Sequence, residues 1–277
     1  MERALSHDLT PSNRLITAPL HSHSVNGLLG LLIIVIVAFV PPILYMLWLR
    51  SAEIYDREPM FAVQGVFLYG MSVALFLALI LETVAIVIIE VAVGGLSIIA
   101  YNLILAVILA PIIEEFTKAT GIMTVTRRLV EPENGLVYGA AVGLGFAAVE
   151  NVLYYITALE AGTEIFIATA IARTLTSTLL HASASALVGF GLSRSRCFYM
   201  FYGTPRSWLP YYVAAVLLHA AFNLLASLSL FDPSVAGMLS LVGLFLSVVL
   251  TWSVVVWVRR KIVQLDRANV GPNIRCE

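Results

Sequence analysis

The chain has 277 residues, of which 60% are hydrophobic and only 12% are charged, and its formal net charge is −1. Soluble domains carry about 25% charged residues, so this composition excludes a water-soluble globule and predicts a multi-pass protein of the cell membrane. The sequence has no basic block suited to nucleic acid, so we expect contact with the lipid bilayer and no nucleic-acid partner.

The chain is predicted to form one membrane domain between two polar ends. Residues 1–25 are polar and show no cleavable signal pattern. We expect a single transmembrane domain over residues 26–260 and a cytoplasmic tail over residues 261–277. No long repeat or linker divides the domain.

Seven apolar stretches are long enough to cross a bilayer, which takes about 20 residues each. They predict an all-α bundle of about seven transmembrane helices. Pro41-Pro42 should kink the first helix, and Pro111 should bend the third by freeing the carbonyl of Val107. The predicted spans are residues 26–49, 61–92, 97–126, 135–158, 164–193, 208–230 and 235–258.

The loops between these spans alternate in charge. Arginines follow the first, third, fifth and seventh spans, whereas the loops near residues 93–96, 159–163 and 231–234 contain no Lys or Arg. By the positive-inside rule, the N-terminus should lie outside and the C-terminus in the cytoplasm.

Only two cysteines occur in the chain. Cys197 is expected in a short basic loop, and Cys276 is the penultimate residue. They offer neither a metal knuckle nor an evident disulfide framework. The ending "RCE" is not a prenylation motif.

Several ionisable side chains lie inside the predicted spans, where a charge near the bilayer centre costs about 2.5–3.5 kcal/mol. Glu82 and Glu90 fall towards the outer end of the second span, and we expect them at the membrane interface. The others need a different explanation, because three of them fall within the five-residue segment "EEFTK". These others are Glu114, Glu115, Lys118, Glu150, Arg173, His181 and His219.

Four of these side chains are predicted to reach a similar depth. With a rise of 1.5 Å per residue from the cytoplasmic helix ends, Glu115, His181 and His219 lie roughly 17–18 Å deep and Glu150 roughly 22 Å deep. Arg173 precedes His181 by eight residues, so it should lie on the same helix face two turns outward. Similar depths on four helices favour a shared polar site.

Structural interpretations compete with this one. Glu114 and Lys118 are four residues apart and could form a salt bridge that only packs the bundle. Glu150 could be held by the hydroxyl of Tyr154, and Arg173 could be a counter-ion for buried acids. A lone intramembrane His is usually a hydrogen-bonded core residue, but two of them level with two Glu residues favour a metal site.

The residue types suit hydrolysis assisted by a metal. Two His nitrogens and a Glu oxygen can hold catalytic Zn²⁺ with a position open for water. A second carboxylate can act as general base and then as proton donor, and we expect Glu114 in this role with Glu115 as the alternate. The candidate metal ligands are Glu150, His181 and His219; the candidate catalytic residues are Glu114, Glu115, Lys118 and Asn223; the candidate supporting residues are Arg173, Asn151, Tyr154 and Phe146.

Short motifs in order along the chain resemble the PrsW family of intramembrane proteases. They are "EEFTK", "FAAVEN" at 146–151, Arg173 with His181, and "HAAFN" at 219–223, and "YDREP" at 55–59 is also similar. The resemblance implies a proteolytic core in which the paired glutamates and the histidines are catalytic or metal-binding. It also implies a wider relation to type II CAAX prenyl endopeptidases and Abi-type membrane proteases.

The sequence therefore predicts an intramembrane protease that hydrolyses a membrane-associated protein or peptide. The resemblance implies a membrane-anchored anti-sigma factor as one such substrate. Two other classes stay open. A non-catalytic scaffold would use the polar core for assembly, but it has less need for two adjacent glutamates. An ion-coupled transporter would use acids and histidines as a relay, and the lack of an obvious inverted repeat argues against it. Within the protease class, a glutamate-activated water without metal is the alternative to zinc.

Overall fold

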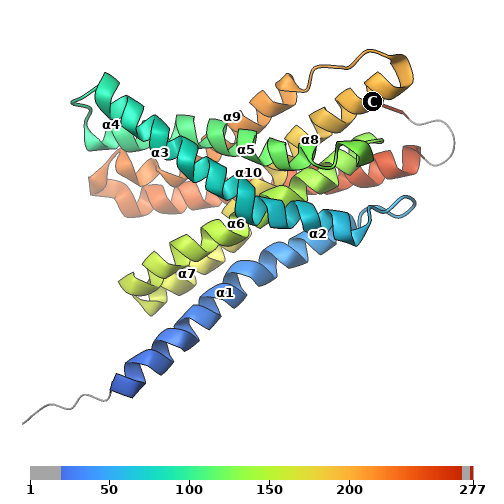
Figure 1. Ribbon diagram of the computed structural model, residues 1–277. Coiled ribbons are helices and arrows are strands. Elements are labelled where there is room, and N and C mark those ends of the chain that lie inside the picture. The colour runs from blue at the N-terminus through green and yellow to red at the C-terminus, as the bar shows by residue number, and fades with distance from the viewer. Residues whose placement is uncertain (1–19, 270–274, 277) are drawn as a thin grey trace, which may run out of the picture.

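The computed structural model describes residues 20–269 and 275–276, with side chains from residue 27 onwards (Figure 1). Every regular element among the described residues is a helix, and no strand occurs among them. Seven segments are long and apolar enough to cross a membrane, which confirms the predicted all-α bundle. The helices are α1 (Leu20–Arg50), α2 (Met60–Tyr69), η1 (Gly70–Ala74), α3 (Leu75–Ala92), α4 (Ile98–Leu103), η2 (Ile104–Leu109), α5 (Ala110–Met123), η3 (Thr126–Arg128), α6 (Pro132–Ala161), α7 (Thr163–Leu175), α8 (Ser177–Tyr202), α9 (Leu209–Ala226), η4 (Leu228–Leu230), η5 (Pro233–Val235) and α10 (Ala236–Ala268).

Four of the spans are composite, the seventh only because the short η5 precedes α10. The second consists of α2, η1 and α3, and the third of α4, η2 and α5, where η1 and η2 are π-helical. The fifth, expected to be one helix, is broken at Thr176, whose φ of −128° and ψ of −80° are not helical. The expectation that Arg173 and His181 share one face of a continuous helix is therefore wrong. The seventh span continues to Ala268, beyond the predicted end at residue 258, because Ile262 and Leu265 are buried in the core.

Helices α6 and α8 pack face to face in the middle of the bundle (Figure 1). Their close approach depends on glycines spaced four residues apart on α6. A methyl group on Gly139 would overlap the carbonyl oxygen of Ser185, and one on Gly143 would overlap that of His181. Small residues at this spacing let membrane helices touch through their backbones. The glycines therefore bring the backbone of His181 against α6.

Replacing Gly139 with Ala should destabilise the bundle. The added methyl group meets backbone atoms of α8, so the two helices must separate, and overpacking of this kind costs about 1–3 kcal/mol. Thermal unfolding in detergent measures the loss. Gly65→Ala is the matched control, because nothing lies within 4 Å of its new methyl group and alanine favours the helix. Equal unfolding temperatures for the two variants would contradict the close packing of α6 on α8.

The loop at residues 51–59, which contains the "YDREP" segment, is anchored to the end of α10. The carboxylate of Asp266 accepts hydrogen bonds from the backbone N–H groups of residues 54, 55 and 56, at 2.8–3.4 Å. Glu53 belongs to the same loop and is fully buried, and its Oε2 accepts a hydrogen bond from the backbone N–H of Glu58 at 2.9 Å. Burial raises the pKa of the Glu53 carboxyl to about 8. These contacts make the loop part of the fold and not a free connection.

The two cysteines form a disulfide bond, contrary to the sequence-based expectation. Cys197 and Cys276 have Cα atoms 5.6 Å apart, although 79 residues separate them in the chain. Cys197 lies in the last part of α8 and not in a loop, because that helix continues to Tyr202. The bond ties the end of the chain to α8, and spacing along the sequence gave no indication of this proximity.

Candidate active site

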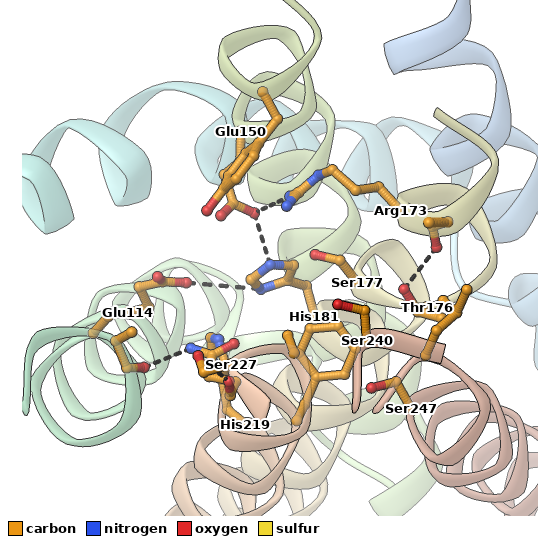
Figure 2. Close-up of a pocket in the computed structure, with 18 of the residues that line it drawn as sticks. Glu114, Glu150, Arg173, Thr176, Ser177, His181, His219, Ser227, Ser240 and Ser247 are labelled. Carbon is orange, nitrogen blue, oxygen red and sulfur yellow. Dashed lines mark hydrogen bonds and ion pairs between the residues drawn. The ribbon is translucent and has the colours of Figure 1, made fainter. Parts of the chain in front are cut away.

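Ionisable side chains from six helices, α3 and α5 to α9, line one cavity of about 490 Å³ (Figure 2). Glu114 of α5, Glu150 of α6, His181 of α8 and His219 of α9 all line it. In Figure 2, Glu150 lies on one side of the His181 ring and Glu114 on the other. Of the four groups predicted at similar depth, Glu150, His181 and His219 line the cavity, and Glu114 takes the place of its neighbour Glu115.

Lys118 is fully buried behind this cavity and connects three of the polar groups. Its ammonium donates to Glu114 at 3.1 Å, to Glu115 at 2.9 Å and to Nδ1 of His181 at 2.8 Å. An ammonium has three hydrogens and no lone pair, so all its donors are used and Nδ1 of His181 is the acceptor. The ammonium also lies 4.2 Å from the centre of the Phe146 ring. One buried cation thus faces two adjacent carboxylates.

Glu150 orients the ring of His181. Because Nδ1 accepts from Lys118, a neutral ring carries its proton on Nε2, which donates to Glu150 Oε2 at 2.8 Å. The same oxygen accepts from Arg173 at 2.8 Å, and Arg173 Nε donates to Asn151 at 2.7 Å. The Arg173 guanidinium stacks over the Tyr154 ring at 3.8 Å. Arg173 and His181 hold Glu150, and no Tyr154–Glu150 hydrogen bond occurs among the described residues.

Glu115 performs the corresponding role for His219. Its Oε1 lies 3.0 Å from Nδ1 of His219, and its Oε2 accepts from the Ser185 hydroxyl at 3.1 Å. Glu115 is fully buried and does not line the cavity. The two imidazole rings pack edge to face with centroids 5.0 Å apart. Each histidine therefore has a carboxylate on one nitrogen, the arrangement that fixes the tautomer of metal-binding histidines.

The donor group that fits a metal is Glu114, His181 and His219. Each offers a ligand atom, and these atoms lie within 4.8 Å of one another in a buried site. The carboxylates paired with the two rings leave Nδ1 of His181 and Nε2 of His219 as the remaining nitrogens. The Lys118 ammonium already lies 2.8 Å from the first of these, Nδ1 of His181. The group differs from the expected ligand set, because Glu114 takes the place of Glu150.

Glu82 belongs to this cavity, so its expected position at the membrane interface is wrong. It is half-buried and lines the cavity with Glu114. Glu82 lies ten residues before the end of α3 at Ala92, which is roughly 15 Å at 1.5 Å per residue. This distance from the helix end could have indicated a position inside the membrane. Glu90, in contrast, is exposed near that end.

Asn223 is the last predicted residue of the site. It lines the cavity, and its Nδ2 donates to the carbonyl oxygen of Ala106 in η2 at 2.7 Å. An amide nitrogen carries two hydrogens, so a second donor remains after this bond. The side chain thus anchors the π-helical wall of the cavity and retains a hydrogen for another acceptor.

Comparison with known proteins identifies the family. Residues 58–257 match the sequence pattern described as PrsW family intramembrane metalloprotease. The chain belongs to the PrsW family. The match contains every ionisable residue that lines the cavity, so in this PrsW chain the family region and the site coincide. No solved structure matches the chain.

Two curated relatives of this PrsW chain carry the name Protease PrsW. The protein of Geobacillus kaustophilus (strain HTA426) is 32% identical over 145 residues, which cover 51% of this chain and 57% of the relative. The protein of Clostridioides difficile (strain 630) is 27% identical over 201 residues, which cover 68% and 76%. The chain thus spans little more than half the length of the first relative.

Proposed function

We propose that this chain is an intramembrane protease that hydrolyses peptide bonds of membrane proteins, with Glu114 as its general base. The observation that carries the proposal is the position of Glu114. Its carboxylate lines a cavity within a membrane bundle and belongs to the same close group as His181 and His219. The name of the two relatives supports the same activity. Cleavage of a labelled single-pass membrane protein by the purified chain in lipid vesicles tests it.

The two adjacent glutamates have different roles in this proposal. Glu114 has one partner, Lys118, within hydrogen-bonding distance among the described residues, and it borders the cavity, so it can take a proton from a water molecule there. Glu115 bonds to Lys118, His219 and Ser185 and is sealed from the cavity. Glu115 therefore positions His219 and the ammonium, while Glu114 reacts.

His181 and His219 would hold the metal ion, for which zinc suits the donor types, while Glu114 beside them stays free to act as the base. When bound, such an ion polarises a carbonyl and lowers the pKa of a bound water. Glu150 keeps the His181 ring oriented, and Arg173 holds Glu150 in turn. A bound ion has to displace the Lys118 ammonium from Nδ1 of His181 or share its position. In the absence of a metal, Glu114 would activate the water alone.

Two donors are available for the oxyanion that forms at the scissile carbonyl. Asn223 borders the cavity and retains one Nδ2 hydrogen after its bond to Ala106. Arg173 borders it as well and carries guanidinium hydrogens beyond those used by Asn151 and Glu150. Donors already fixed at the place where charge develops are an effective source of transition-state stabilisation.

The setting of the reaction is the cell membrane. The seven apolar spans require a substrate that reaches the site from the bilayer or its surface. A membrane-anchored regulator such as an anti-sigma factor meets this requirement, and the motifs shared with the family support it. The same motifs support a wider relation to type II CAAX prenyl endopeptidases and Abi-type membrane proteases.

The purified chain should contain close to one equivalent of zinc, and the loss of either histidine should remove most of it. Each ring supplies one of the two histidine ligands, so the ion is held far more weakly after the loss of either. Elemental analysis of wild type, His181→Ala and His219→Ala measures this. Glu90→Gln is the control, because Glu90 is exposed near the end of α3. Equal metal content in all four proteins would refute the metal site and leave the mechanism that uses Glu114 alone.

A further inference from the structure

The cavity of the site meets a second cavity at Glu82. This second cavity has a volume of about 340 Å³ and lies between α3 and the segment formed by η2 and the start of α5. Glu82, Ala106 and Ala110 line both cavities. Ile86 and Leu105 line only the second one. The two cavities therefore adjoin at these shared residues, and the outer one has mostly apolar walls.

The second cavity lies at the lipid-facing side of the bundle. Val87 and Ile88 of α3 are 53% and 60% exposed, and Ile108 of η2 is 52% exposed. Large apolar side chains exposed on a transmembrane helix face the hydrocarbon of the bilayer. The second cavity thus lies between this lipid-facing surface and the cavity that Glu114 lines.

The seam between α3 and η2 is held weakly. Among the described residues, no hydrogen bond links α3 to η2, and the Tyr101 hydroxyl meets Glu90 only beyond the seam, at 3.5 Å. The other side of the wall is tied to α9, because Asn223 donates to Ala106 and the Tyr212 hydroxyl donates to Ile112 at 2.8 Å. Because η2 is a π-helical segment, its backbone departs from the regular ladder, as is frequent at functional sites. The seam can therefore open without breaking a hydrogen bond.

Glu82 is the polar group at the junction of the two cavities. Among the described residues it has no ion pair or hydrogen bond, whereas Glu114 and Glu150 both have cationic partners. A transmembrane helix that enters a protease must unwind locally before it can be cut, and the backbone N–H groups freed in this way need new acceptors. A carboxylate accepts such hydrogens strongly. Glu82 lies where the first freed N–H groups would arrive.

From these observations we propose that a transmembrane segment of the substrate enters between α3 and η2, and that Glu82 binds the backbone N–H groups of its unwound part. The inference rests on the proposed protease function and adds the form in which the substrate is taken: a membrane-spanning helix from the bilayer. Glu82 acts as a positioning residue, and Glu114 as the reacting one.

Photo-crosslinking tests the route. A photoreactive amino acid is placed at Leu105, in the Glu114→Gln background so that substrate is held uncleaved, and the partner is a labelled single-pass protein that the wild type cleaves. Ile36 of α1, which is 50% exposed, is the matched control position facing lipid. We expect a strong crosslink at position 105 and only background at position 36. Equal crosslinking at both positions would overturn the route.

Kinetics test the role of Glu82. Glu82→Leu should raise KM about tenfold, as expected for one lost hydrogen bond to a charged group, with kcat nearly unchanged. Glu82→Gln keeps an acceptor oxygen and should have a smaller effect. An unchanged KM in Glu82→Leu would overturn the role of Glu82. If the wild type cleaves no single-pass protein, the proposed function fails and this inference fails with it, whereas cleavage without enrichment at position 105 overturns the route alone.

Discussion

Replacing Glu114 with Gln should lower the rate of peptide-bond cleavage about 10²–10⁴-fold, the usual cost of losing a general base. The amide keeps the size of the side chain and still accepts a hydrogen bond from Lys118, so the bundle should fold with a similar unfolding temperature. The amide has no basic oxygen with which to take a proton from water. The measurement is the initial rate of cleavage of a single-pass membrane protein in vesicles at saturating substrate.

The neighbouring glutamate gives the comparison that separates chemistry from structure. Glu115→Gln leaves the cavity wall intact, because Glu115 does not line it, but it removes the anion that Lys118 and His219 share. We expect a lower unfolding temperature together with a lower rate in this variant. If Glu114→Gln cleaves at the full rate and Glu115→Gln does not cleave, Glu115 is the general base and Glu114 the positioning residue. Full activity in both variants would favour a scaffold whose cleavage comes from another protein.

Replacing Lys118 with Met should cost about 3–5 kcal/mol of the free energy of unfolding, as when one partner of a buried ion pair is removed. The ammonium is fully buried and compensates the two carboxylates of Glu114 and Glu115. Methionine has a similar length but no charge, so two adjacent buried anions would remain without the cation between them. Thermal or denaturant unfolding in detergent measures the change.

Two further proteins make the Lys118 prediction specific. Lys261→Met alters the only other lysine of the chain, which is half-buried on α10, and should change the unfolding free energy by less than about 1 kcal/mol. Adding Glu114→Gln and Glu115→Gln to Lys118→Met removes the uncompensated charges and should restore part of the lost stability. Failure of the triple variant to recover any stability would show that Lys118 acts through packing and not through its charge.

Much of the fold could be predicted because membranes impose a simple rule on sequence. Each span is an apolar run of fixed minimum length, and a carboxylate or imidazole inside such a run stands out without any structural knowledge. This is why "EEFTK", Glu150, His181 and His219 stand out as candidate site residues. The contact of α6 with α8 could also have been predicted, since Gly135, Gly139 and Gly143 repeat at a four-residue interval.

The partners within the site could not be predicted in the same way. Glu114 and Glu115 differ by about 100° around one helix, and only the packing of α5 decides which of them borders the cavity. The sequence offered Arg173 as a counter-ion for buried acids, and Glu150 is the acid that it binds. That His181 binds the same carboxylate depends on the break at Thr176, which sets how α7 and α8 lie relative to each other. Pro111 lies just after η2 and frees the carbonyl of Val107 within it, so the sequence marks this place as irregular, but nothing in "ILAVIL" specifies π-helical turns.

The contact between Cys197 and Cys276 also limits how many times the chain between them can cross the bilayer. Two sulfurs that meet must lie on the same face of the bilayer, whether they are joined or reduced, so the chain between them crosses an even number of times. The two spans formed by α9 and α10 satisfy this count. Five candidate spans precede Cys197, so Gly27 and Cys276 would lie on opposite faces if every candidate span crosses the bilayer. A label that reaches only one side of sealed vesicles should then reach either Gly27 or Cys276 and not both.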